Sequence, residues 1–289
     1  SSINSDIIWV LKPVGRRNNK RKITLLSLNK LSYISKAACI GAAVSAIAAC
    51  SSTPSTPLAG VKSHTLSNAV IYQTSSKEYP VLSSFVYNQA IAALPTRFAD
   101  GDVVVMDVDE TVLDNSTYQK ERESVGLGYS SKSWADWVKR EEATLVPGVA
   151  AFIDEVVVRN GKVALITNRD KTLDSHTWNN LLAQGLPLTT SNTCVVGRTA
   201  EDKEAVGQEG MVNDKDLRRM QLTQGKIACS NTSKDATSTW AVPHTIIMQI
   251  GDNIEDVGGV TQESANVQSL MPRVGTEIFI LPNPMYGSW

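Results

Sequence analysis

The sequence has few of the residues that usually bind zinc. Its 289 residues include only three histidines and four cysteines, and no two cysteines form a CxxC pair. Protein zinc sites are built mainly from such side chains at short spacings. The composition therefore argues against a zinc site, and we expect His176 and His244 to be surface or structural residues.

Residues 37–50 form an apolar stretch that is too short to cross a membrane, which takes about 20 residues. A basic segment precedes it, because residues 1–50 hold eight Lys and Arg residues against one acid, Asp6. A basic segment followed by a short apolar run that ends in small residues is typical of an export signal. Residues 1–20 extend farther upstream than such a signal requires, so the true start of the chain stays open.

The end of this apolar stretch, Ile47-Ala48-Ala49-Cys50, resembles a bacterial lipobox, in which Cys50 would become the lipidated first residue of the mature chain. The alternative is an ordinary signal peptide in which Cys50 is incidental. A Ser-, Thr- and Pro-rich stretch follows and has the composition of a flexible tether. We therefore predict a signal over residues 1–50, a tether over 51–65 and one domain over 66–289, in an exported bacterial lipoprotein or a periplasmic protein that contacts the membrane only through its lipid.

Beyond residue 50 the chain carries 20 bases and 28 acids, a net charge of −8. An acidic body argues against binding to nucleic-acid polymers, although a local cationic site could still take an anionic substrate. Cys194 and Cys229 would face an oxidising compartment, where a disulfide and two buried thiols both stay open.

Strand-like and helix-like segments alternate along this body. Short apolar runs predict strands at 103–106, 162–169, 193–196, 245–250 and 277–281. Helical spacing predicts two helices within 66–94 divided by Pro80, one at 134–138 capped by Ser133, one between Pro147-Gly148 and Asn160-Gly161, and others at 172–184 and 214–221. Residues 229–240 are rich in Ser, Thr and Asn and predict an exposed insertion. The alternation indicates an α/β fold with a doubly wound parallel sheet.

Polar side chains follow three of these strands. Asp107 and Asp109 end the first, Thr167-Asn168-Arg169 ends the second, and Asp252 with Asp256 follows the fourth. The carboxyl ends of parallel strands lie at one edge of a sheet, so these groups should converge. Carboxylates without His or Cys partners suit Mg²⁺, and Thr167, Asn168 and a nearby lysine would offer donors to a phosphate.

These motifs resemble those of the haloacid dehalogenase superfamily: DxDxT at the first strand, Thr after the second, a lysine, and GDNxxD after the fourth. More narrowly, residues 105–115 with residues 250–256, and the closing segment 281–289, resemble the bacterial class C acid phosphatases, which include outer-membrane lipoprotein 5′-nucleotidases. The resemblance covers roughly residues 66–289. The chain departs from it at Val257, where the family usually has an aromatic residue, and at the insertion 229–240.

The resemblance implies a haloacid dehalogenase-like domain with a small helical cap or accessory region. It also implies an acid phosphatase that hydrolyses small phosphomonoesters through an aspartyl-phosphate. Asp107 would be the nucleophile and Asp109 the general acid and base, its pKa raised by the neighbouring carboxylate. Mg²⁺ would bind Asp107, the main chain of Asp109, and Asp252, with Asp256 supporting the metal or the lysine.

Other assignments concern the substrate. Thr167, Asn168 and Lys215 would hold the phosphoryl group, with Lys203 and Lys226 as alternatives to Lys215. By resemblance, Tyr286 is the favoured stacking partner for a nucleobase, ahead of Tyr118 and Phe98, although a core position explains these residues equally well. The resemblance also makes nucleoside 5′-monophosphates the expected substrates. Arg169 is equally well explained as a phosphate ligand or as an ion-pair partner. We expect Asp114, Asn115, Trp134, Trp137 and Trp178 to be structural.

Two other functions stay open at this stage: a non-catalytic surface lipoprotein that keeps the fold, and another hydrolase of the same superfamily with a different leaving group. A homodimer is a possible assembly. The leaving group, the pH optimum and the oligomeric state are not defined by the sequence.

Overall fold

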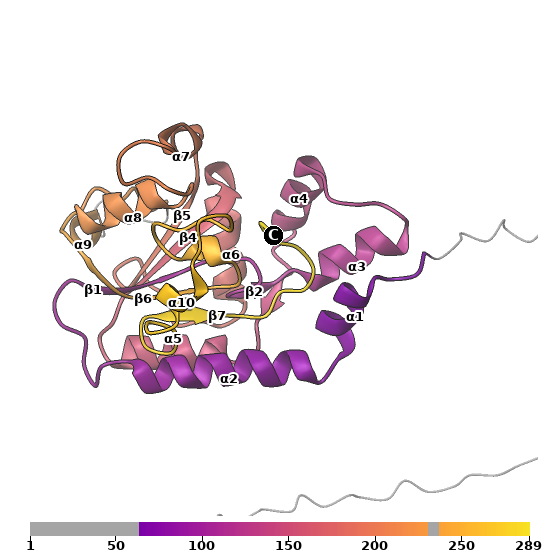
Figure 1. The fold of residues 1–289 in the computed structure, drawn as a ribbon, viewed down its shortest axis with the longest axis horizontal. Coiled ribbons are helices and arrows are strands. Elements are labelled where there is room, and N and C mark those ends of the chain that lie inside the picture. Colours follow the sequence, from indigo (N-terminus) through magenta and orange to yellow (C-terminus); the bar gives the residue numbers. More distant parts are fainter. Residues whose placement is uncertain (1–63, 231–236) are drawn as a thin grey trace, which may run out of the picture. The chain divides into compact units, whose positions relative to one another are not determined.

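The computed structural model describes residues 64–230 and 237–289. Its central feature is a sheet of parallel strands in the order β5-β4-β1-β6-β7 (Figure 1). The strands are β1 (Asp102–Met106), β4 (Val163–Asp170), β5 (Thr193–Arg198), β6 (Thr245–Gly251) and β7 (Ile278–Ile280). The predicted α/β fold with a parallel sheet is confirmed, and all five predicted strands are present.

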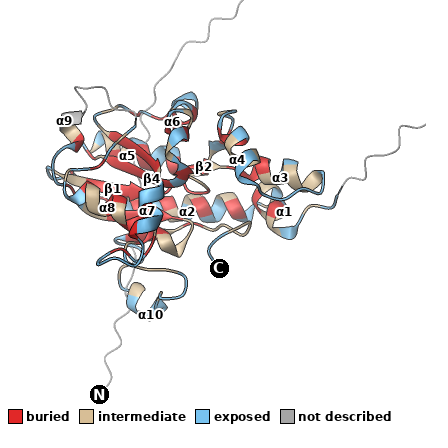
Figure 2. Cartoon of the chain, turned by 90° about the horizontal axis from the view of Figure 1, so that it is seen from above, coloured by how far each residue is buried: buried red, intermediate tan, exposed pale blue. Residues whose placement is uncertain are grey.

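Both faces of the sheet are buried, because successive side chains of β1 enter two different apolar clusters. Val104 and Met106 pack into the larger cluster, whereas Val103 and Val105 pack into the smaller one. Figure 2 shows the buried strands between their covering helices. A strand buried on both faces reads as a continuous apolar run, which is why it could be predicted from sequence.

The larger cluster is covered by α2 (Glu78–Ala93), α5 (Val149–Val158) and α6 (Asp174–Ala183), through residues such as Tyr87, Phe152 and Leu181. The smaller cluster is covered by α8 (Asp216–Thr223) and α9 (Thr237–Trp240), through Leu222 and Trp240. Helices on both faces make the sheet doubly wound, as predicted.

The helix α5 begins after a glycine that the backbone requires. Gly148 has φ +96°, and a Cβ there would lie 3.0 Å from the Ser84 Cα. A residue with a side chain would be strained at this φ and would press on α2.

Between β1 and α5 the chain forms a helical accessory region, which lies beside the sheet in Figure 1. It comprises the short antiparallel pair β2 (Leu113–Asp114) and β3 (Thr144–Leu145), with α3 (Ser116–Ser124) and α4 (Ser131–Val138) between them; α1 (Asn68–Ser75) contacts α3. This insertion follows the two acids of β1 directly and therefore stands over the carboxyl edge of the sheet.

Two predicted helix boundaries are wrong. Pro80 lies within the first turn of α2, where a missing N–H costs nothing, and the division from α1 falls at 76–77 instead. The N-cap of α4 is Ser130, whose side chain accepts a hydrogen bond from the backbone N–H of Ser133, so Ser133 lies inside the helix.

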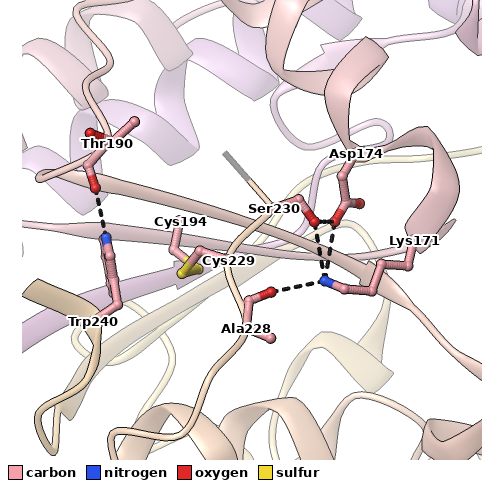
Figure 3. The surroundings of a disulfide bond; sticks show 8 residues. All are labelled: Lys171, Asp174, Thr190, Cys194, Ala228, Cys229, Ser230 and Trp240. Atoms are coloured by element: carbon pink, nitrogen blue, oxygen red, sulfur yellow. Dashed lines mark hydrogen bonds and ion pairs between the residues drawn. A yellow bond between two sulfur atoms is a disulfide. The ribbon is translucent and has the colours of Figure 1, made fainter. Parts of the chain in front are cut away.

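The predicted exposed insertion 229–240 lies partly outside the described residues, which omit 231–236, and contacts hold both of its described ends. Cys229 forms a disulfide with Cys194 of β5 (Figure 3). At the other end Trp240 is buried and donates its indole N–H to the Thr190 carbonyl at 2.9 Å. Between them, Ser230 binds the Asp174 carboxylate.

The remaining elements are short: α7 (Ala200–Ala205), α10 (Val267–Leu270) and the 3₁₀ turns η1 (Lys171–Leu173) and η2 (Ile254–Asp256). Among the described residues, no helix combines the length and hydropathy that a membrane span requires. The predicted export signal, Cys50 and the tether through residue 63 lie outside the described residues.

Candidate active site

Side chains that follow β1 and β6 meet at the carboxyl edge of the sheet. Carboxylate oxygens of Asp107, Asp252 and Asp256 all lie within 4.8 Å of one another. Asp107 and Asp256 are buried, and Asp252 is partly buried. The convergence expected from parallel strands is present in the structure.

A buried lysine enters this cluster from the start of α8. The Nζ of Lys215 donates to Asp107 Oδ1 at 2.5 Å and to Asp256 Oδ1 at 2.6 Å. Burial disfavours the charged ammonium, but the two carboxylates outweigh it and raise the pKa of Lys215. Lys203 and Lys226 are exposed, so Lys215 is the lysine that the fold brings to the acids.

The cluster contains three acidic groups and one basic group. Burial raises the pKa of Asp107 to about 7; Lys215 opposes this rise, while Asp256 and Asp109 add to it. Burial, then Asp256 and Asp107, also raises the pKa of Asp252 well above its usual range. Three carboxylates with one ammonium are a donor set that fits a divalent cation, which would offset the remaining charge.

Neighbouring residues fix the two acids that follow β6. Asp252 accepts from the Thr111 hydroxyl at 3.2 Å and from the Asn283 amide at 2.8 Å. Asp256 accepts at Oδ2 from the backbone N–H of Asn253 at 2.9 Å, which leaves Oδ1 for the lysine. The cluster is therefore held in place by groups from β6, from the loop after β1 and from the C-terminal segment.

Asp109 does not point its side chain into the acid cluster. Its carboxylate forms an ion pair with Arg169, whose Nη2 lies 2.7 Å from Oδ1 and whose Nε lies 2.9 Å from the same oxygen. The guanidinium of Arg169 therefore lies directly against the Asp109 carboxylate. Of the two explanations for Arg169, the ion pair is the one that the structure shows.

Thr167 and Asn168 stand at the end of β4. The Thr167 hydroxyl is buried, lies 3.4 Å from Asp109 Oδ2 and accepts from the Arg169 N–H. The Asn168 amide oxygen accepts from Arg218 at 3.1 Å. Arg218 is buried and also donates to the Thr167 carbonyl, so this arginine of α8 ties the strand end to the helix that carries Lys215.

These groups open into a cavity of about 460 Å³. Its polar floor includes Asp107, Asp109 and Lys215, and its aromatic wall consists of Tyr129, Trp134 and Tyr286. Arg198, paired with Asp214 at 2.9 Å, adds a cation to the lining. The cavity lining thus combines charged with aromatic side chains.

Some aromatic assignments change with the structure. Phe98 and Tyr118 are buried in the core and do not line the cavity, whereas Trp134, expected to be structural, does. Trp137 and Trp178 are packing residues, as expected. Sequence reasoning did not single out Tyr129, Arg198 or Asn283. Nothing local in the chain distinguishes Tyr129 and Asn283 from other loop residues, or Arg198 from other residues at a strand end.

His176 and His244 make structural contacts, as expected. His176 contacts Glu141 at 2.6 Å. His244 is buried and stacks on Trp240, with ring centroids 5.1 Å apart.

Comparisons with known proteins agree with this geometry. Residues 34–289 match the family model described as HAD superfamily, subfamily IIIB (acid phosphatase). A class C acid phosphatase from Bacillus anthracis is 27% identical with a TM-score of 0.60, covering 76% of this chain and 84% of that one. A second structure of the Bacillus anthracis class C acid phosphatase, with tungstate bound, is 26% identical with a TM-score of 0.58 and the same coverage.

Proposed function

Since this chain belongs to the HAD superfamily, subfamily IIIB (acid phosphatase), we propose that it is a Mg²⁺-dependent enzyme acting on nucleoside 5′-monophosphates. The family makes it a phosphoric monoester hydrolase. The metal, the nucleotide and the covalent intermediate are the proposed part.

The bridge from Lys215 to Asp107 carries the proposal. A carboxylate with a cation beside it can receive a phosphoryl group, because the ammonium offsets the charge of the incoming oxygens. A carboxylate that served only to hold the fold would not need to border an open cavity.

In the proposed first step, an Asp107 carboxylate oxygen attacks phosphorus and the bond from phosphorus to the ester oxygen breaks. Asp109 gives its proton to the departing oxygen, so an alcohol leaves. In the second step water attacks the phosphorus of the aspartyl-phosphate and Asp109 takes its proton. Inorganic phosphate leaves, and both aspartates return to their starting forms.

Asp107, Asp252 and the main-chain carbonyl of Asp109 would hold the Mg²⁺, which would supply positive charge to the phosphoryl oxygens. Asp256 would act through Lys215, since its Oδ1 is already bound to that lysine. Thr167 and Asn168 would donate to the phosphoryl group. Tungstate in the similar Bacillus anthracis enzyme supports binding of a tetrahedral oxyanion.

The aromatic wall supports a nucleobase as part of the leaving group. Aromatic side chains offer flat surfaces on which a base can stack. Tyr286 lines the cavity and offers such a surface.

The proposal includes export and lipidation at Cys50. The purified full-length chain should hydrolyse nucleoside 5′-monophosphates with a higher kcat/KM than sugar phosphates, lose activity with EDTA, and recover it with Mg²⁺. Asp107→Asn should be folded and inactive. Full activity of this variant would refute the mechanism, an equal kcat/KM for sugar phosphates would refute the nucleotide preference, and the absence of lipid on the mature chain would refute the anchor.

A further inference from the structure

The side chain of Asn115 lies between the accessory helix α4 and Asp109. It is fully buried. Its Nδ2 donates to Asp109 Oδ1 at 2.9 Å, and its Oδ1 accepts from the Trp137 indole N–H at 2.8 Å. The backbone N–H of Asn115 donates to Glu110 Oε1 at 2.7 Å. The residue therefore connects the side chains of Asp109, Trp137 and Glu110.

The chemistry of these partners allows only one orientation of the Asn115 amide. An indole N–H can only donate, and so can the Arg169 guanidinium, whose Nη2 lies 3.3 Å from Asn115 Oδ1. The amide oxygen must therefore face Trp137 and Arg169. The amide nitrogen then faces Asp109, where it can only donate.

As a result the two oxygens of Asp109 differ. Oδ1 accepts from Arg169 at 2.7 and 2.9 Å and from Asn115 at 2.9 Å. Oδ2 has longer contacts, 3.2 Å to Arg169 Nε and 3.4 Å to the Thr167 hydroxyl. A proton is most easily carried on the oxygen with the fewest and weakest donors, because each donor competes with it for a lone pair.

We propose that Asn115 and Trp137 are positioning residues that saturate Oδ1 of Asp109 and so reserve Oδ2 for proton transfer to the leaving group. The proposal rests on the proposed function, in which Asp109 is the general acid. Trp134 lies one turn before Trp137 on α4 and lines the cavity. The helix that contacts the leaving group therefore also sets the position of the acid.

Substrates that differ in their need for a proton test this role. An alkoxide leaving group requires protonation, whereas 4-nitrophenoxide leaves as an anion. Trp137→Phe removes the indole N–H and keeps most of the packing. It should lower kcat/KM for an alkyl phosphate by roughly 10- to 100-fold and for 4-nitrophenyl phosphate by less than about threefold. Asn115→Ala should show the same pattern more strongly.

Tyr118→Phe is the matched control, because it removes the 2.8 Å hydrogen bond between Tyr118 and Ser133 in the same accessory region without touching Asp109. It should affect both substrates alike and by less than about twofold. If Trp137→Phe lowers kcat/KM equally for the alkyl phosphate and 4-nitrophenyl phosphate, or lowers it for neither substrate, the positioning role is wrong. Trp137→Phe decides the question even if Asn115→Ala fails to fold.

The Asp109→Asn variant distinguishes a failure of this inference from a failure of the proposed function. It should lose far more activity on the alkyl than on the aryl phosphate. If it does so while Trp137→Phe shows no leaving-group dependence, only the positioning role fails. If Asp109→Asn itself shows no such dependence, the general-acid role fails and the inference falls with it.

Discussion

The Arg169 guanidinium and the Asp109 carboxylate form an ion pair at 2.7 Å beside the acid cluster, with side-chain exposures of 1% and 15%. Arg169 also donates from Nη1 to the Thr177 hydroxyl at 3.1 Å, so the guanidinium is held by hydrogen bonds to both Asp109 and Thr177. The pair places a cation against one aspartate of the DxD motif, while Lys215 serves the other.

Removal of the Arg169 guanidinium should lower the free energy of unfolding. Arg169→Met leaves Asp109 without its cation, and we expect the free energy of unfolding to fall by about 3 kcal/mol, at the lower end for a buried pair because Asp109 reaches the cavity. Urea unfolding measures the change. Arg273→Met, which breaks an exposed pair with Glu277, is the control and should cost less than about 1 kcal/mol. Equal losses would show that burial of the Arg169 pair is unimportant.

Lys215→Met should abolish most of the activity. The variant leaves Asp107 and Asp256 without the ammonium that bridges them, so kcat/KM should fall by roughly 100-fold or more. Lys203→Met removes an exposed lysine and should stay within about twofold of the parent. Similar losses in the two variants would contradict the assignment of Lys215.

A divalent cation should stabilise the folded chain. Binding to the acid cluster raises the unfolding midpoint in proportion to the logarithm of the Mg²⁺ concentration, and Asp252→Asn should remove most of this shift. Asp136→Asn alters an exposed acid of α4 and should keep it. Thermal unfolding at several Mg²⁺ concentrations checks this without relying on activity. A shift that survives in Asp252→Asn would place the cation elsewhere.

Gly251 allows the close approach of Asp256 to β6. A Cβ at Gly251 would lie 2.0 Å from Asp256 Oδ2, so Gly251→Ala should displace Asp256 and deprive Lys215 of one partner. We expect at least a tenfold loss of kcat/KM, of the order seen when a supporting group is removed. Gly128→Ala meets no atom within 4 Å and should behave as the parent. Parent-like activity of Gly251→Ala would mean that Asp256 need not stay at this place.

The disulfide should stabilise the folded chain relative to the unfolded chain. Cys194 and Cys229 are 35 residues apart and enclose the segment that carries Lys215. Replacing both cysteines by alanine should lower the free energy of unfolding by roughly 3–4 kcal/mol, from the chain entropy released in the unfolded state. A reductant should destabilise the parent and leave the double variant unchanged. Insensitivity of the parent would contradict a stabilising role.

Much of the fold could be predicted because its signals are local. The apolar run of β1 and the helix stop at Asn160-Gly161 depend on residues next to one another in the chain. The helix boundaries predicted at Pro80 and Ser133 are wrong because a local sequence signal can fit more than one position. A proline and a serine are each tolerated at several positions of a first helical turn, and only the hydrogen bonds decide which one is used.

The sequence by itself determined that acids follow parallel strands, and therefore that Asp107 and Asp252 would lie on the same edge of the sheet. The pairing of β1 with β6, which the tertiary structure decided, brings them within reach of each other. Only the tertiary structure decided what faces each acid. The bridge from Lys215, the ion pair of Arg169 with Asp109 and the link from Trp137 through Asn115 join residues far apart in the chain or on separate elements. Such contacts follow from packing and from the pairing of buried charges, which no local pattern encodes.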